Sequence, residues 1–389
     1  MVIWMLLINA TIYTMEDAVI EHGYVQIKDG KISAVGSMER VPQDEEILDL
    51  KGKALYPGFI DAHCHMGMAE EGLDFEGDDL NEMTDPVTPH LRALDAINPC
   101  NQSFPEAVDA GITTVVTGPG SANAISGQIC AIKTYGRRVD KMVLKEPAAI
   151  KFALGENPKK VYNDKSETPM TRMATAALIR EELRKAQRYM EDVEKAAADE
   201  EEETDPPEFD AKKEALVPLL KKELKAHFHC HRTDDIFTAV RIAEEFDLDY
   251  VLIHCTEGHL IADDLAEIGA PVVNGPLMCT RTKPELANAS DETPGILSKA
   301  GLKVAICTDY NVIPIWMLPI TAGYAVREGM DYMEALRAIT INAAQICGIA
   351  DRVGSIQVGK DADLLVYSCD PLTLAAKPEM VFINGKQVK

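Results

Sequence analysis

The sequence of 389 residues lacks a long apolar run and is poor in basic residues. A transmembrane helix needs about 20 consecutive apolar residues, and no segment approaches this length. Lys and Arg together number 39, against 63 Asp and Glu, which gives a formal net charge of -24. A surface this acidic repels nucleic-acid phosphates and anionic lipids. We therefore expect neither a nucleic acid nor a membrane as a partner.

Paired cysteine motifs are also missing, and we expect no secretory leader. None of the nine cysteines belongs to a CxxC pair, and several, such as Cys307, lie in apolar runs. This pattern is typical of free buried thiols in a reducing compartment. The apolar start, residues 2–10, lacks a basic segment and continues into residues 11–14, which predicts a first strand rather than a signal peptide. The expected localisation is the cytoplasm.

Apolar, β-branched runs alternate with helical stretches after Pro57. This alternation predicts an α/β fold, a parallel (β/α)8 TIM barrel over residues 57–359. Short strand-like segments near both ends of the chain, with turns at Asp29-Gly30 and Asn384-Gly385, predict a small β-sandwich domain built from residues 1–56 and 360–389. The eight runs expected as barrel strands are 55–62, 113–116, 129–132, 148–153, 225–229, 250–254, 271–274 and 304–308.

One region departs from this alternation between the fourth and fifth expected strands. Residues 170–195 have strong helix formers with apolar residues at helical spacing, and a second helix is expected over 211–225. The acidic run 199–203 and Pro206-Pro207 separate them. We expect a helical excursion over about 165–225 that forms a solvated surface hairpin, although it could also cover the mouth of the barrel.

Histidines are concentrated where the expected barrel strands end. Active sites of TIM barrels lie at the C-terminal ends of the strands, and histidines satisfied in a core would not gather there. Asp309 follows the eighth run, and Lys151 lies near the end of the fourth. Imidazole and carboxylate groups are common ligands of divalent metals, so the pattern predicts a metal site. The three clusters are His63 and His65; His227, His229 and His231; and His254 and His259.

Two longer motifs resemble those of one superfamily. Residues 57–65, Pro-Gly-Phe-Ile-Asp-Ala-His-Cys-His, are similar to the first-strand signature of the amidohydrolase superfamily. Residues 340–346 and 354–363 resemble its C-terminal hallmark. Within the superfamily the sequence is most similar to a little-characterised subgroup of the imidazolonepropionase-related branch, which also holds Xaa-Pro dipeptidases and zinc carboxypeptidase-like enzymes. The resemblance implies a divalent metal, zinc foremost, with one or two ions per chain, and a homo-oligomer.

The resemblance also implies a ligand set. One metal would be bound by His63, His65 and Asp309, and a second by His229 and His254. Lys151, carboxylated on its amine, would bridge them, because a carbamate supplies a negatively charged oxygen ligand.

Three alternatives compete with a metal-bridging role for Lys151. Lys133 also ends an expected strand and could bridge the metals instead. Lys151 could form an ordinary salt bridge to Glu156. Imidazolonepropionases bind a single metal and lack the lysine, and their sixth-strand histidine contacts the substrate.

Other residues at the same end are candidates for substrate contact. His231 lies two residues beyond His229 and shares its face of the strand, so it could polarise the scissile carbonyl. His227 would lie deeper, in a supporting or core position. Arg232 and Arg281 could bind a carboxylate or lie on the surface. For His259, substrate contact and plain solvation are both open.

The implied reaction is hydrolysis of a C–N amide bond by metal-activated hydroxide, with Asp309 as general base and then general acid. A dipeptide or an N-acyl amino acid is the first choice of substrate. A cyclic amide of the imidazolone kind, hydrolysed with one metal, is the second, and deamination at a ring carbon is the third. A catalytically inactive metal-binding module is the alternative from another class.

Overall fold

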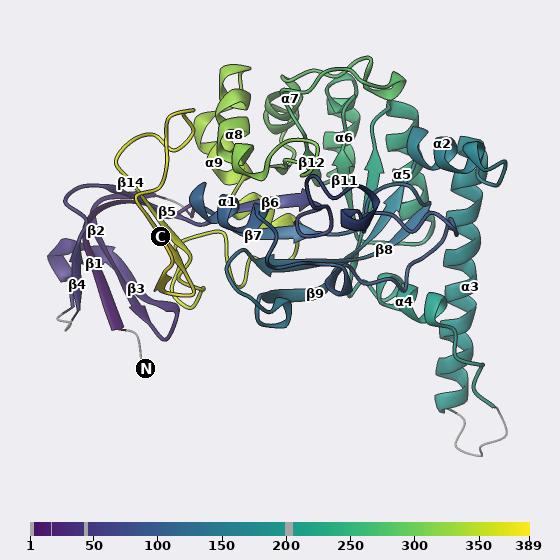
Figure 1. Ribbon diagram of the computed structural model, residues 1–389, viewed down its shortest axis with the longest axis horizontal. Coiled ribbons are helices and arrows are strands. Elements are labelled where there is room, and N and C mark those ends of the chain that lie inside the picture. The colour runs from purple at the N-terminus through teal and green to yellow at the C-terminus, as the bar shows by residue number, and fades with distance from the viewer. Residues whose placement is uncertain (1–3, 17, 43–45, 199–204) are drawn as a thin grey trace.

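The computed structural model describes residues 4–16, 18–42, 46–198 and 205–389 (Figure 1). An eight-stranded sheet in the order β13-β12-β11-β10-β9-β8-β7-β6 forms its centre. The end strands β6 and β13 also contact each other, so the sheet is a nearly closed barrel. Its strands are β6 (Phe59–Cys64), β7 (Ile112–Thr117), β8 (Ile125–Lys133), β9 (Val143–Ala153), β10 (Lys225–Cys230), β11 (Tyr250–His254), β12 (Val272–Asn274) and β13 (Val304–Ile306).

The expectation of a wholly parallel barrel is wrong at one strand. β8 runs antiparallel to both neighbours, with Thr114 opposite Lys133 and Gln128 opposite Ile150. The connections 118–124 and 134–142 are too short for the helical crossover of about a dozen residues that a parallel neighbour requires. The C-terminal end of β8 therefore lies at the opposite end of the barrel from the C-terminal ends of the other strands.

The expected first barrel strand, residues 55–62, is divided between two sheets. Its first part is β5 (Ala54–Pro57), which pairs with β1 (Trp4–Tyr13) and β14 (Leu364–Tyr367), and its second part is β6. Gly58 joins them. A Cβ atom at Gly58 would lie 2.0 Å from the Thr113 hydroxyl oxygen, so only glycine fits where the chain crosses from one sheet to the other.

The second sheet contains strands from both terminal segments. Its order is β16-β15-β14-β5-β1-β2-β3, with β4 paired to β1. The division into a β-sandwich domain and a barrel domain at residues 56 and 360 stays a prediction. The remaining strands of this sheet are β2 (Val19–Lys28), β3 (Lys31–Ser37), β4 (Ile47–Asp49), β15 (Met380–Ile383) and β16 (Lys386–Gln387).

Helices surround the barrel sheet (Figure 1). Among the described residues, none of the helices is both long enough and apolar enough to span a bilayer. The helices outside the excursion are α1 (Ser103–Asp109), α2 (Glu156–Asp164), α5 (Thr233–Glu245), α6 (Ala262–Ile268), α7 (Thr293–Lys299), α8 (Leu318–Arg327), α9 (Tyr332–Ala338) and α10 (Ile341–Ile346).

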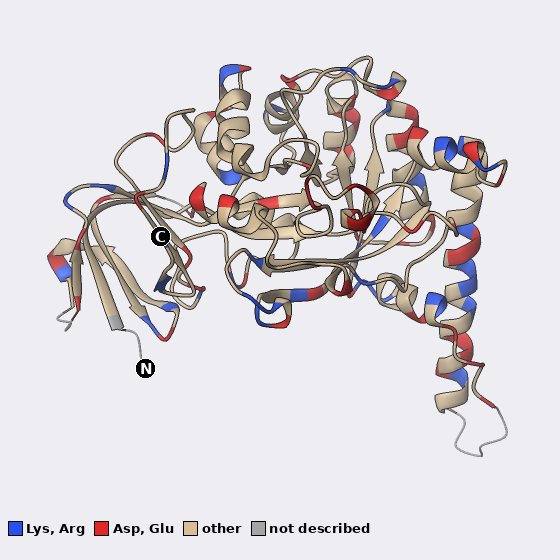
Figure 2. Cartoon of the chain, viewed as in Figure 1, with Lys and Arg blue, Asp and Glu red and all other residues tan. Residues whose placement is uncertain are grey.

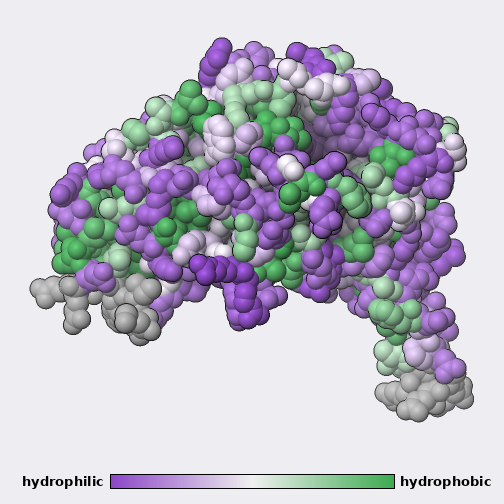
Figure 3. Space-filling model, in the orientation of Figure 1, coloured by the Kyte–Doolittle hydropathy of each residue, from purple (hydrophilic) through white to green (hydrophobic). Residues whose placement is uncertain are grey.

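The helical excursion consists of α3 (Arg172–Ala198) and α4 (Ala211–Leu220). Ile179, Leu183 and Ala186 form a buried stripe at helical spacing along α3, while charged residues of both signs line its outer surface (Figure 2). The second helix ends five residues before the predicted Lys225, which instead begins β10. The acidic run 199–203 lies outside the described residues. Hydrophilic side chains cover much of the face in Figure 3, with hydrophobic patches among them, one of them on the lower part of the projection that contains α3.

Candidate metal centre

Six side chains meet in a cavity of about 460 Å³ at one end of the barrel. His254 is the last residue of β11, and His229 and Lys151 lie near the ends of β10 and β9. His63 lies directly beneath this cavity, at the end of β6, and is 1 % exposed. The candidate ligands and catalytic groups among the residues that line the cavity are His65, Lys151, His229, His231, His254 and Asp309.

The first group of possible metal ligands is His63, His65 and Asp309, whose ligand atoms all lie within 4.8 Å of one another. Asp309 Oδ1 lies 3.4 Å from His63 Nε2 and 3.2 Å from His65 Nε2. His65 Nδ1 lies 2.6 Å from the Gly118 carbonyl oxygen. Because a carbonyl only accepts, Nδ1 carries the proton and Nε2 presents its lone pair toward Asp309, as in a metal ligand.

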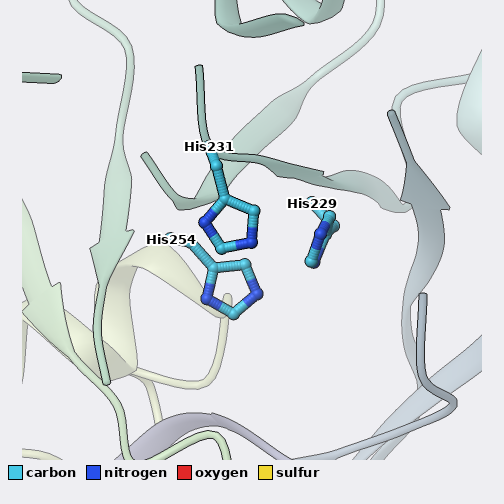
Figure 4. A group of neighbouring side chains, drawn as sticks. All are labelled: His229, His231 and His254. Carbon is cyan, nitrogen blue, oxygen red and sulfur yellow. The ribbon is translucent and has the colours of Figure 1, made fainter. Parts of the chain in front are cut away.

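The second group is His229, His231 and His254 (Figure 4). Their ring centroids lie 4.6 to 4.7 Å apart; the rings of His231 and His254 stack, and the ring of His229 is nearly perpendicular to both. His254 Nδ1 lies 2.7 Å from the Gly275 carbonyl oxygen, which again leaves Nε2 free to bind a metal. His231 Nδ1 instead contacts the Thr256 hydroxyl at 2.7 Å.

Burial sets the charge of these groups. It lowers the pKa of His229 and His231 well below the ordinary value, and that of His254 to about 4. Burial alone would raise the pKa of Asp309, but His254, His63 and His65 hold it well below its usual range. Neutral imidazoles beside an ionised carboxylate form a donor set that fits a divalent metal.

Backbone conformation and a buried carboxylate fix the positions of these ligands. His254 and Asp309 both have positive φ, 67° and 52°, a conformation that non-glycine residues seldom adopt outside constrained sites. Asp61, fully buried on β6, accepts hydrogen bonds from the His63 amide and from the amide and hydroxyl of Thr308. It thereby links the strand that carries His63 to the segment that carries Asp309.

Lys151 lines the same cavity and contacts the first group. Its Nζ is 2.9 Å from His63 Nε2, and the side chain is almost fully buried. Burial lowers the pKa of Lys151 to about 8. Among the ion pairs of the described residues there is none between Lys151 and Glu156. The Glu156 amide instead donates to Glu285 Oε2 at 2.9 Å.

Lys133 does not lie in this cavity. Because β8 is reversed, Lys133 lies at the other end of the barrel, where it is buried and ion-paired with Asp363 and, at 3.1 Å, with Asp361. These interactions connect the barrel to the segment that leads into β14. The geometry therefore excludes Lys133 as the bridging lysine.

We expect Lys133→Met to destabilise the fold by about 3–5 kcal/mol, because removing one partner leaves buried charges uncompensated. Denaturant unfolding measures this loss. Arg138→Met removes one partner of an exposed pair with Asp140 and is the matched control, expected to cost less than about 1 kcal/mol. Metal content per folded molecule should be unchanged in both variants. Loss of metal from folded Lys133→Met would contradict the assignment.

Three predicted substrate contacts are not brought to the cavity wall. Arg232 binds Asp234 through two hydrogen bonds of 3.0 and 2.9 Å, just before α5. Arg281 donates to the Ala289 carbonyl oxygen at 2.6 Å. His259 Nδ1 contacts the Thr293 hydroxyl at 3.0 Å. His227 lies deeper in β10, 1 % exposed, in a core position.

Two residues of the cavity region were not anticipated from the sequence. Glu285, 1 % exposed, lies on the short 3₁₀ helix η6 (Pro284–Leu286) in the connection from β12 to α7. Its Oε1 atom is 3.5 Å from His231 Nε2 and 4.0 Å from His229 Nε2. Lys283, beside it, lines the cavity. Nothing in the local pattern Thr282-Lys283-Pro284-Glu285 indicates that a loop residue reaches the histidines.

Comparison with known proteins agrees with this geometry. The sequence model of the amidohydrolase family matches residues 54–388. "Amidohydrolase tasK" of Hapsidospora irregularis is 28% identical over 95% of this chain, which spans only 39% of that protein's length. An imidazolonepropionase of Symbiobacterium thermophilum is 26% identical over 91% of this chain and 86% of its own.

Solved structures share the fold. An amidohydrolase from Thermotoga maritima MSB8 superposes with a TM-score of 0.94 at 43% identity, covering 99% of both chains. A prolidase complexed with N-methylphosphonate-L-proline has a TM-score of 0.61 at 19% identity, covering 100% of both chains, and shows the fold alone. The chain belongs to the amidohydrolase family, in its imidazolonepropionase-related branch, and is a metal-dependent amidohydrolase.

Proposed function

We propose that this enzyme hydrolyses the amide C–N bond of a dipeptide or an N-acyl amino acid with two divalent metal ions, zinc foremost. The observation that carries the proposal is Lys151, a buried lysine in the cavity that both groups of possible ligands share. His63, His65 and Asp309 would hold one ion, and His229 and His254 the other. A metal bound at such a site lowers the pKa of water toward neutrality and polarises a carbonyl group.

Lys151 suits the bridging role after carboxylation. Burial brings the pKa of its amine to about 8, so more of it is uncharged near neutral pH than in an exposed lysine. The uncharged amine is the form that adds to carbon dioxide, with release of one proton. The resulting carbamate would supply an oxygen ligand on either side, where an ammonium group would repel both ions.

Asp309 is the proposed general base and acid. Its carboxylate reaches the cavity, where its side chain is 14% exposed, and its low pKa keeps it ionised before it accepts a proton from the attacking water. It would then hand this proton to the leaving nitrogen. His231 would polarise the scissile carbonyl. Its Nε2 has no hydrogen-bond partner among the described residues, so an N–H there could donate to the substrate oxygen.

A cyclic amide is the second candidate substrate, supported by the similarity to imidazolonepropionases over most of the chain. Those relatives are 26–27% identical, too distant to carry a substrate across. Lys151 favours the first candidate, because the single-metal mechanism has no need of a lysine between the ligand groups.

Metal removal and a substrate panel test the proposal. We expect a chelator to abolish hydrolysis of N-acyl amino acids or dipeptides, and zinc to restore it. Metal analysis of the active protein should give two ions per chain. The panel includes imidazolone propionate and methylthioadenosine as probes of the cyclic-amide and deaminase alternatives. Turnover of only one of these two, or metal-loaded protein that hydrolyses no amide in the panel, would refute the proposal.

A further inference from the structure

The charged residues that line the cavity are few. Among the described residues these are the cations Lys151 and Lys283 and the anions Asp291 and Asp309, besides the histidines. Lys151 is 1 % exposed, whereas the Lys283 side chain is 27 % exposed, so Lys283 is the cation available to a substrate. Arg232 and Arg281, the arginines expected in this role, make their contacts elsewhere.

Two neighbours hold the Lys283 side chain in place. Its Nζ lies 2.7 Å from Glu285 Oε1 and 3.1 Å from Asn157 Oδ1. Asn157 is fixed in turn, because its Nδ2 donates to the Ser121 hydroxyl at 2.8 Å. An ammonium group has three N–H donors, so at least one N–H remains for a ligand beside these two contacts. The side chain is 27% exposed and therefore reachable from the cavity.

Glu285 also sets the distance from Lys283 to the metal centre. Its Oε1 atom, which binds the ammonium, faces His231 Nε2 at 3.5 Å and His229 Nε2 at 4.0 Å. One carboxylate oxygen therefore separates the ammonium from two imidazoles of the second ligand group. A group bound by Lys283 would lie within a few covalent bonds of a carbonyl placed at the metals.

We propose that Lys283 binds a free carboxylate of the substrate, on the leaving-group side of the scissile amide. In an N-acyl amino acid or a dipeptide, only Cα and the amide nitrogen separate the α-carboxylate carbon from the scissile carbonyl carbon, a separation suited to this site. The inference rests on the proposed amide hydrolysis and deepens it, since it restricts the substrates to those with a free C-terminal carboxylate. Glu285 and Asn157 are positioning residues for the ammonium.

Matched pairs of ligands test this role. The probes are N-acetyl-L-methionine and glycyl-L-proline, each compared with its C-terminal carboxamide in kcat/KM. We expect the wild type to prefer the carboxylates by about 10- to 100-fold, the value of one charge-assisted hydrogen bond. Lys283→Met should bring this ratio near one, whereas Lys283→Arg should retain most of it. Arg281→Met, on the same loop but away from the cavity, is the control and should keep the wild-type ratio.

The ratio separates recognition from a merely structural role. If Lys283 only neutralises buried Glu285, then Lys283→Met lowers turnover of acids and amides equally and the ratio stays at its wild-type value, which would overturn the inference. Calorimetric binding of the same probes to zinc-loaded protein tests recognition where hydrolysis fails. If the wild type binds the carboxylates more tightly than the carboxamides and Lys283→Met removes this preference, the inference is supported even though the proposed function has failed. If the wild type binds both equally, the inference is refuted.

Discussion

Lys151→Ala is expected to reduce kcat/KM by about 10³-fold or more, because losing the bridge would remove several kcal/mol of transition-state stabilisation at 1.36 kcal/mol per tenfold. The same change should lower the metal content from two ions to one per chain. Intact-protein mass spectrometry under non-acidic conditions should find one added carbon dioxide on the wild type and none on the variant. The fold should survive, since the substitution removes a buried amine and its desolvation cost.

Lys133→Met is the natural comparison for this experiment. It replaces the other buried lysine that ends a barrel strand, yet it should leave the added mass and the metal content unchanged while lowering stability. Wild-type protein with one metal and no added mass would contradict the bridged pair. It would favour the single-metal alternative.

Asp309→Asn is expected to lower kcat by about 10²- to 10⁴-fold, the contribution of a positioned general base and acid. The amide has nearly the same shape, but it neither accepts the proton from water nor supplies an anionic oxygen between His63 and His65. Binding of the first metal should weaken as well, which titration with a metal indicator measures. KM should change much less than kcat, because substrate contacts remain.

Asp291→Asn is the matched control, a second carboxylate that lines the same cavity. Asp291 Oδ1 accepts a hydrogen bond from the Met278 amide at 3.2 Å and lies outside both ligand groups. Its loss should change kcat only a few-fold, as expected for a group away from the reacting atoms. Equal losses in both variants would show that cavity charge in general, rather than proton transfer by Asp309, supports turnover.

The residues at strand ends were predictable, and the loop residues were not. The C-terminal ends of parallel barrel strands lie at the same end of the barrel. Residues at those ends could therefore be grouped from the sequence alone, namely His63, Lys151, His229, His254 and Asp309. Lys133 shows the limit of that reasoning, because it assumes that every strand points the same way. Apolar β-branched runs look alike in parallel and antiparallel strands, and only the short connections on either side of β8 distinguish the two arrangements.

Loop positions depend on contacts that periodicity does not encode. Glu285 reaches His231 because its other oxygen accepts the Glu156 amide, a partner far away in sequence. Arg281 and Arg232 were expected to bind a substrate carboxylate because of their charge. In the structure each instead donates to an acceptor close to it in the sequence, the Ala289 carbonyl oxygen and the Asp234 carboxylate. A substrate carboxylate predicts a cationic side chain at the mouth of the barrel, but only the tertiary structure shows that Lys283 is the lysine at that place.

The reversal of β8 has a consequence for how this enzyme selects its substrate. In a regular barrel, each mouth loop leads from a strand into a helix; here, residues 118–124 join two paired strands and are held at both ends. Ser121 in this hairpin anchors Asn157, and Asn157 anchors Lys283. Recognition is then preorganised, because little conformational entropy remains to be lost when the ligand binds. We expect the mouth to discriminate as a rigid template, without a closing movement on that side.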